Sequence, residues 1–200
     1  KGITHQCDDQ TQTGKKIDTN FIGVLTPGQQ EAVDKLLESS IGILSATTGF
    51  GKTVVAASLI AKRNVNTLII VHRKQLIEQW KERLNVFLDK GILIGQIGGG
   101  KNKQTYSIDI ATSQSLNYQG EIKDDVTKYG QIIVDECHHI SAISFEKVMK
   151  KVEAKYVCGL TATPTRKDGL HPIMSMQLGS IRHKVTAKSY AQVHAFEHLL

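Results

Sequence analysis

Residues 46–53 read Ala-Thr-Thr-Gly-Phe-Gly-Lys-Thr, a glycine-rich stretch set between two apolar segments. The apolar run 41–44 precedes it and the run 53–61 follows, so the stretch is predicted to connect a strand to a helix. In that setting, backbone N–H groups of the loop and of the first helical turn converge on phosphate oxygens, and Lys52 adds a mobile positive charge. The pattern predicts a phosphate-binding loop; the alternative is a glycine-rich turn before a buried helix.

The loop departs at one position from the pattern G-x-x-x-x-G-K-[ST], because Ala46 stands where the first glycine is usually written. Gly49 and Gly51 keep the positions where the backbone must approach phosphate without a Cβ atom in the way. The hydroxyl of Thr53 is expected to bind Mg²⁺. The predicted nucleotide-binding residues of this loop are Thr48, Gly49, Gly51, Lys52 and Thr53.

A second motif supports the first, because Asp135 and Glu136 directly follow the apolar run 131–134. A carboxylate at the carboxyl end of a central strand lies where open α/β sheets bind their ligands. We expect Asp135 to hold Mg²⁺ through its water shell, and Glu136 to orient and deprotonate an attacking water. Together with Lys52 these two residues form the predicted catalytic set. An Asp-Glu pair taken alone would indicate only a solvated turn.

The composition predicts one globular domain, since the 200 residues are 40% hydrophobic and 22% charged. A net charge of +6 favours a polyanionic partner but does not establish one. The chain has neither an apolar stretch of membrane-spanning length nor a signal-peptide pattern, so we expect a cytoplasmic protein without membrane contact. Cys7, Cys137 and Cys158 are odd in number and scattered, which indicates free thiols and neither a zinc site nor a disulfide framework.

Apolar and helical segments alternate from residue 25 onward. The expected strands lie near 41–46, 67–71, 92–97, 107–112, 130–135 and 155–160, with a further one at 181–186. Their continuous apolar runs are typical of a parallel sheet covered on both faces. A helix from about 74 to 88 carries an apolar stripe that includes Trp80, so this tryptophan is predicted to lie in the core and not to stack on bases. The order predicts an α/β fold, a RecA-like P-loop domain with a mainly parallel sheet and helices on both faces.

From about residue 25 to about residue 182 the chain resembles superfamily 2 helicases and translocases of the DExH type, most of all the group of the type III restriction-enzyme res subunit. The segments that carry the resemblance are Leu25-Thr-Pro-Gly-Gln-Gln30, residues 46–53, residues 70–80, Ala111-Thr-Ser-Gln-Ser-Leu116, Asp135-Glu-Cys-His138 and Leu160-Thr-Ala-Thr-Pro164. They match, in order, the adenine-reading glutamine segment and motifs I, Ia, Ib, II and III of that superfamily.

The resemblance assigns Gln29 to the N6 and N7 edge of adenine, with Gln30 as a substitute. A local alternative stays open, because Thr26-Pro-Gly-Gln29 is also a capping box with proline at the first helical position. The resemblance further assigns coupling between hydrolysis and domain movement to His138, Thr161 and Thr163. A hydrogen-bonded core histidine is the alternative for His138.

Contacts to the phosphodiester backbone of a nucleic acid are implied for two segments. These residues are Arg73 and Lys74 of motif Ia and Thr112, Ser113 and Gln114 of motif Ib. Such contacts grip a strand without reading its sequence, as a motor requires. The alternative is a solvated face. The basic glycine loop 98–104 is either a phosphate contact or a mobile hairpin.

The resemblance implies the first motor domain of an ATP-dependent helicase or translocase in restriction or repair. Its cofactors would be ATP and Mg²⁺ and its partner nucleic acid, with DNA favoured over RNA. We expect a polar arm or linker at 1–24, the motor domain at 25–182, and at 183–200 the start of a connection to a second RecA-like domain that is missing from this fragment.

The second domain would supply arginine fingers, which are worth about 10³ to 10⁵ in rate in other NTPases. The fragment is therefore expected to bind nucleotide weakly, to turn over little and not to unwind a duplex; unwinding by the chain alone would contradict this.

Two other functions compete with the motor. A P-loop kinase or NTPase acting on a small molecule would lack the segments Val-His-Arg-Lys and Thr-Ala-Thr-Pro. A nucleic-acid-binding module with an inactive motor would not need Lys52, Asp135 and Glu136 together.

Overall fold

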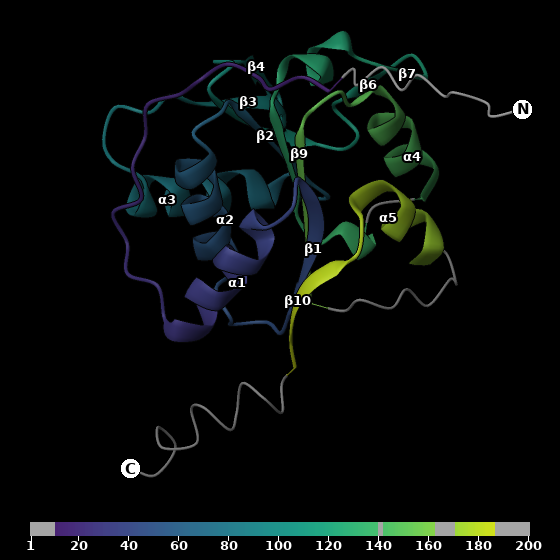
Figure 1. Ribbon diagram of the computed structural model, residues 1–200. Coiled ribbons are helices and arrows are strands. Elements are labelled where there is room, and N and C mark those ends of the chain that lie inside the picture. The colour runs from purple at the N-terminus through teal and green to yellow at the C-terminus, as the bar shows by residue number, and fades with distance from the viewer. Residues whose placement is uncertain (1–10, 140–141, 163–170, 187–200) are drawn as a thin grey trace, which may run out of the picture.

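The centre of the protein is a sheet of eight strands in the order β10-β1-β9-β8-β2-β5-β3-β4 (Figure 1). The structure is a computed structural model that describes residues 11–139, 142–162 and 171–186. The strands are β1 (Ile41–Ala46), β2 (Thr67–Val71), β3 (Ile94–Gly98), β4 (Lys101–Lys103), β5 (Ile108–Thr112), β8 (Gln131–Val134), β9 (Tyr156–Thr161) and β10 (Ile181–Val185). All neighbouring pairs are parallel except the antiparallel pair β3 and β4. The mainly parallel α/β sheet predicted from the sequence is confirmed.

Helices cover both faces of the sheet, with α1, α2 and α3 on one side and α4 and α5 on the other (Figure 1). Their bounds are α1 (Pro27–Leu37), α2 (Lys52–Arg63), α3 (Gln75–Phe87), α4 (Ala142–Lys151) and α5 (His171–Leu178). The remaining elements are the short hairpin β6 (Asn117–Tyr118) and β7 (Glu121–Ile122) and the 3-10 turns η1 (Asp124–Lys128) and η2 (Cys137–His139). The helix predicted near 74–88 is α3.

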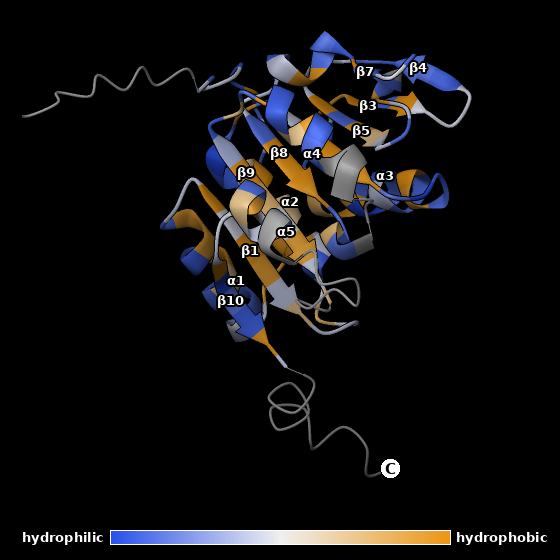
Figure 2. Ribbon diagram, turned by 90° about the vertical axis from the view of Figure 1, so that its right-hand side faces the viewer, coloured by the Kyte–Doolittle hydropathy of each residue, from blue (hydrophilic) through white to orange (hydrophobic). Residues whose placement is uncertain are grey.

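The hydrophobic core has two layers, one on each face of the sheet. Ile69 and Ile133 pack with α1, α2 and α3, whereas Ile70 and Ile132 pack on the opposite side with Val148 of α4. Successive strand residues point to opposite faces, so both sets must be apolar when both faces are covered. Figure 2 shows the hydrophobic strand β8 beneath α4. This two-sided burial explains the continuous apolar runs of the sequence.

The start of α1 is fixed by local hydrogen bonds. The Thr26 hydroxyl accepts from Gln29 N at 3.3 Å, and the Gln29 side-chain oxygen accepts from Thr26 N at 3.0 Å. Pro27 occupies the first helical turn, where its missing N–H leaves no bond unmade. The capping box recognised in the sequence is therefore present, and it holds Gln29 beside the glycine-rich loop 46–53.

The segment that precedes α1 packs along the amino ends of the central strands, opposite to the glycine-rich loop 46–53. Asn66, at the start of β2, accepts from the backbone N–H groups of Lys15 and Gly130 and donates to the Lys128 carbonyl. Ile17 is buried in the helical layer. Backbone hydrogen bonds rather than an apolar stripe hold this polar segment. The domain boundaries expected at residues 24 and 182 stay predictions.

Gly130→Ala is expected to lower the free energy of unfolding by about 1–3 kcal/mol, the usual cost of adding a methylene where there is no room. Its Cβ would lie 2.7 Å from Gly14 Cα and closer still to the Thr13 carbonyl oxygen, and backbone atoms cannot move aside by changing rotamer. Gly28→Ala is the control, because its Cβ would meet only Phe50 Cε2, at 3.7 Å. Urea denaturation measures both; equal stability of Gly130→Ala and the native protein would contradict the packing of residues 13–14 against Gly130.

Candidate functional site

The predicted site residues gather at the carboxyl edge of the parallel sheet. The loop 46–53 connects β1 to α2, Asp135 follows β8, and Thr161 ends β9. Because β1, β9 and β8 are neighbours in the sheet, these three chain segments meet at one edge. This is the edge at which open α/β sheets bind their ligands.

The loop adopts a backbone that only glycine accepts readily at two positions. Gly49 has φ +89° and Gly51 has φ +88°, both in the left-handed region. A Cβ at Gly51 would lie 2.5 Å from the side-chain nitrogen of Gln29, which donates to the Phe50 carbonyl at 2.8 Å. A Cβ at Gly49 would meet no atom within 4 Å, so the side of the loop at Gly49 is open. The loop is thus held from one side by α1 and leaves room for a ligand on the other.

Lys52 is folded over this loop. Its ammonium group donates to the Ala46 carbonyl at 3.1 Å and lies 3.4 Å from the Glu136 carboxylate. The Lys52 side chain is only 11% exposed. Residues from the two sequence motifs are therefore in direct contact.

Asp135 is held by two contacts from the chain segment 70–80. Its backbone N–H donates to the Ile70 carbonyl at 2.9 Å, and its Oδ2 accepts from the indole N–H of Trp80 at 2.8 Å. Burial raises the pKa of the Asp135 carboxyl, and the nearby Glu136 charge adds to this, while the Trp80 hydrogen bond and the Lys52 charge act in the opposite direction. The Asp135 carboxyl therefore loses its proton less readily than an exposed aspartic acid does.

Glu136 stands in a strained backbone conformation with φ +44°. Its Oε2 accepts from the backbone N–H of Ala162 at 3.3 Å and lies 3.3 Å from Nδ1 of His138. That same nitrogen is 2.7 Å from the Thr161 hydroxyl. Non-glycine residues in the left-handed region concentrate at functional sites, where surrounding contacts maintain the strain.

Of the predicted coupling residues, the structure brings His138 and Thr161 together and links both to Glu136. Thr163 lies outside the described residues. His138 is a hydrogen-bonded histidine with its side chain 13% exposed. Both interpretations of His138 from the sequence are compatible with this geometry.

The two segments assigned to nucleic acid lie side by side, because β2 and β5 are neighbours and Ser113 N donates to the Val71 carbonyl at 3.0 Å. Arg73, Lys74 and Gln114 are exposed, whereas Thr112 and Ser113 are buried. The Thr112 hydroxyl accepts from Ser115 N and so shapes the turn after β5.

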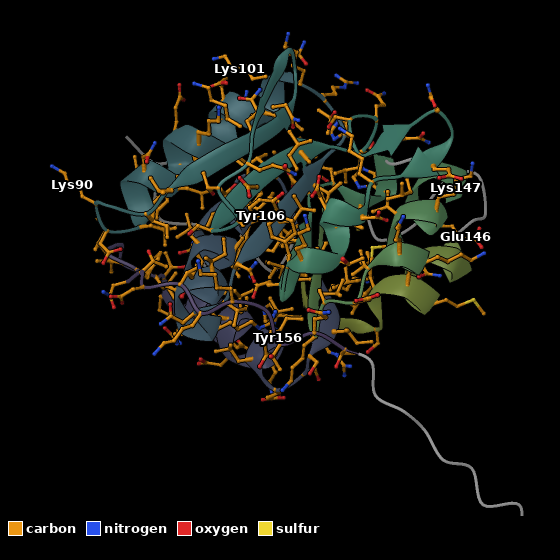
Figure 3. All side chains as sticks on the ribbon, turned by 90° about the horizontal axis from the view of Figure 1, so that it is seen from above. Lys90, Lys101, Tyr106, Glu146, Lys147 and Tyr156 are labelled. Carbon is orange, nitrogen blue, oxygen red and sulfur yellow. The ribbon has the colours of Figure 1, made fainter. Side chains whose placement is uncertain are left out.

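The glycine loop 98–104 adjoins this surface. It forms the tight connection of the β3–β4 hairpin, and a Cβ at Gly99 would lie 3.1 Å from the Lys74 side chain. Lys101 extends outward from this hairpin, as Figure 3 shows. The hairpin thus adds positive charge beside Lys74.

The donor set fits a nucleotide with Mg²⁺. Thr53 and Asp135 offer the oxygen ligands that Mg²⁺ prefers, and this ion commonly takes one or two carboxylates together with substrate phosphates. Within the described ranges there is no group of three His, Cys, Asp or Glu residues that could bind a metal by itself.

Cys137 and Cys158 are free and buried, as predicted, and Cys7 lies outside the described residues. Burial raises the pKa of the Cys158 thiol to about 11. In the part of the chain that the structure describes, no helix has the length and apolar character needed to cross a membrane.

The sheet order and the helices on both of its faces define a class, the RecA-like domains. Residues 22–166 match the family described as "Type III restriction enzyme, res subunit", and the chain belongs to this family.

Two relatives illustrate the match. The chain is 36% identical over 163 residues to the DNA 3'-5' translocase XPB2 of Sulfurisphaera tokodaii, covering 82% of this chain and 36% of that protein. It is 35% identical over 174 residues to a protein of Acanthamoeba polyphaga mimivirus whose name describes an ATP-dependent RNA helicase, covering 83% of this chain and 33% of that protein. The chain thus spans about a third of the length of these relatives.

The fold is shared with the crystal structure of the UvsW helicase from bacteriophage T4. The TM-score is 0.69 at 22% identity, and the match covers 84% of this chain and 63% of that one. The RecA-like fold expected from the sequence is thereby confirmed.

Sequence reasoning missed three contacts of the site. The sequence did not predict that the Trp80 N–H and the Ala162 N–H donate to the two carboxylates, nor that the Asp135 backbone N–H donates to the Ile70 carbonyl. A signal existed for Trp80 only, since a buried tryptophan usually finds an acceptor for its N–H. Trp80 is 3% exposed, which confirms its predicted place in the core.

Asp135→Asn is expected to raise the free energy of unfolding at neutral pH. The pKa of Asp135 in the folded protein lies above its ordinary value of 3.8, so the folded state binds the proton more tightly than the unfolded state does. This proton binding contributes fully to the free energy of unfolding below pH 3.8, and the contribution is lost as the pH rises through the raised pKa. Asparagine is neutral at every pH, so the stability gained over the native protein should disappear at low pH, where Asp135 is neutral as well. Denaturation curves at a series of pH values measure the difference.

Asp89→Asn is the control, because the opposite change in stability is expected for it. Hydrogen bonds from the backbone and side chain of Asn20 and from Thr19 lower the pKa of Asp89, so its stabilisation is lost as the pH falls through that lowered pKa. This variant should be less stable than the native protein at neutral pH. If Asp135→Asn were destabilised in the same way, the raised pKa would be disproved.

Proposed function

We propose that this chain is the first motor domain of an ATP-dependent nucleic-acid helicase or translocase. The observation that carries the proposal is the contact of Lys52 with Glu136, which joins the glycine loop after β1 to the acidic pair after β8. Membership of the res-subunit family and the names of the two relatives support it.

The loop and the amino end of α2 would bind the phosphates of ATP. Lys52 would exchange its contacts to Ala46 and Glu136 for oxygens of the β- and γ-phosphates. Thr53 and Asp135 would hold Mg²⁺, which neutralises charge on those phosphates when bound. Glu136, released from Lys52, would accept a proton from the attacking water.

His138 and Thr161 would transmit the state of Glu136 to the third motif. Glu136 Oε2 accepts from Ala162 N, in the backbone directly after Thr161, and contacts His138, whereas Oε1 faces Lys52. A carboxylate that takes the proton on Oε1 would therefore remain connected to the third motif through Oε2. The start of the segment 160–164 is thus bound to the residue that performs the proton transfer. This is the physical basis for assigning a coupling role to the pair, and to Thr163 by its place in the same segment.

Gln29 would contact adenine while keeping its present bonds. An amide side chain has two donor hydrogens and two acceptor lone pairs, and Gln29 uses one donor on Phe50 and one acceptor position on Thr26. One N–H and one lone pair remain, which matches the N7 acceptor and N6 donor of adenine. The capping box and the adenine contact are therefore compatible functions of one residue.

The surface formed by residues 73–74 and 112–114 would bind the nucleic-acid backbone. Arg73 and Lys74 provide exposed charge, and Gln114 an exposed amide. Because Thr112 and Ser113 are buried, their part in binding would come from the backbone of the turn. We propose DNA as the track, as the name of the Sulfurisphaera relative states for that protein.

A second RecA-like domain would complete the catalytic site by supplying arginine fingers. The relatives are about three times as long as the matched region, which leaves room for such a domain in them. Efficient turnover would then be a property of the longer protein.

Lys52→Ala is expected to weaken ATP binding about 10- to 100-fold, because losing one hydrogen bond between charged groups costs about 1.5–3 kcal/mol. Calorimetric titration with ATP and Mg²⁺ measures the loss. Lys62→Ala is the matched control, since Lys62 belongs to the same helix and its partner Asp34 is a surface residue. Equal affinity of Lys52→Ala and the native protein would rule out the proposed phosphate site.

ATP turnover of the proposed longer protein that includes the second motor domain, measured with single-stranded DNA, duplex DNA or RNA, tests the motor function. Stimulation by one polymer, absent in Lys52→Ala and in Glu136→Gln, would identify a nucleic-acid motor and its track. Turnover that ignores all three polymers would favour an NTPase acting on a small molecule.

A further inference from the structure

We propose that Trp80 is a positioning residue of the metal site, whose indole N–H fixes the orientation of the Asp135 carboxylate from helix α3. The proposal rests on the proposed ATPase function and goes beyond it, because it adds a residue from outside the nucleotide-binding motifs. Sequence reasoning placed Trp80 in the core only.

The geometry makes Trp80 more than a packing residue. The indole nitrogen donates to Asp135 Oδ2 at 2.8 Å, an ordinary hydrogen-bond length, while the ring is 3% exposed. Trp80 belongs to the same apolar cluster as Ile77 and Leu84 of α3 and Val71 of β2. The ring is thus immobilised by its neighbours, so the direction of its single N–H is fixed.

A fixed donor decides which oxygen of Asp135 is left for the metal. The backbone of Asp135 is anchored by the Ile70 carbonyl, and Oδ2 accepts from Trp80, so Oδ1 would be the oxygen that accepts from water molecules around Mg²⁺. Without the indole N–H, the carboxylate could turn about its terminal torsion toward the ammonium group of Lys52. Such a turn would compete with metal binding.

The same bond connects the metal site to the surface proposed for nucleic acid. Leu76 N and Ile77 N donate to the carbonyls of Arg73 and Lys74 at 3.1 Å each, so these two residues are continuous with the first turn of α3. Trp80 lies on the next turn of this helix. A displacement of Arg73 and Lys74 by a bound strand would therefore reach Asp135 through a rigid helix and one hydrogen bond.

The test removes the N–H and keeps the shape of the ring. Trp80 is replaced by β-(3-benzothienyl)alanine at this position alone, which puts sulfur where the indole has N–H, and Trp80→Phe serves as a second, genetically encoded variant. Leu84→Ala is the matched control, because Leu84 is fully buried on the same face of α3 and makes no side-chain hydrogen bond. Binding of a non-hydrolysable ATP analogue is then titrated over a series of Mg²⁺ concentrations.

Loss of the N–H should raise the Mg²⁺ concentration for half-maximal binding about 10- to 100-fold, the usual effect of removing a residue that orients a metal ligand. Binding of the analogue without Mg²⁺ should be unchanged. Leu84→Ala should keep the Mg²⁺ dependence of the native protein even where it lowers the melting temperature. In turnover assays the two Trp80 variants should also lose most of the stimulation by nucleic acid.

An unchanged Mg²⁺ dependence in the benzothienyl variant would overturn the proposal, and so would an equal shift in Leu84→Ala, which would show an effect of packing alone. These results differ from a failure of the proposed function, in which the native protein itself would not bind the analogue more tightly than Lys52→Ala. If Trp80→Phe does not fold, the Mg²⁺ dependence of the benzothienyl variant alone tests the proposal.

Discussion

The parallel register of the central strands is the constraint on which the site depends. Ser45 is paired with Thr161, and Val134 with Gly159 and with Ile70, so the carboxyl ends of β1, β9, β8 and β2 lie along the same edge of the sheet. A shift by one residue would turn each side chain to the other face of the sheet. Asp135 would then point away from the helix that carries Lys52. The two apolar layers prevent such a shift, because each strand residue is committed to one of them.

Three features of the candidate site lower the stability of the folded protein. Asp135 is a buried carboxylate, Glu136 has a left-handed backbone, and Lys52 is nearly covered. A left-handed residue other than glycine costs about 1–2 kcal/mol. The large apolar core on both sides of the sheet offsets such costs. Stability and function thus oppose each other at these positions, as is common in active sites.

Most strands of the sheet and the acidic pair were predictable because each has a local sequence pattern, such as the apolar run before Asp135. The contact of Trp80 with Asp135 has no such pattern. Periodicity gives the face of the helix on which Trp80 lies, but not which buried polar atom it will meet. The packing of residues 12–17 was equally hidden, because it depends on the Asn66 side chain and backbone hydrogen bonds. Strand β4 was missed because three exposed polar residues give no strand pattern.

Part of the positive charge of the protein lies on the two outer strands of the sheet. In the described part of the chain, β4 and β10 each have one unpaired edge, and both strands are rich in cations: Lys101, Lys103, Arg182 and Lys184. A bare strand edge can pair with the edge of another molecule, and charged side chains oppose this by mutual repulsion. Four cations of a chain with net charge +6 therefore lie where they protect the protein from aggregation. The basic character of the chain would in this respect limit edge-to-edge association, in addition to its proposed role in attracting nucleic acid.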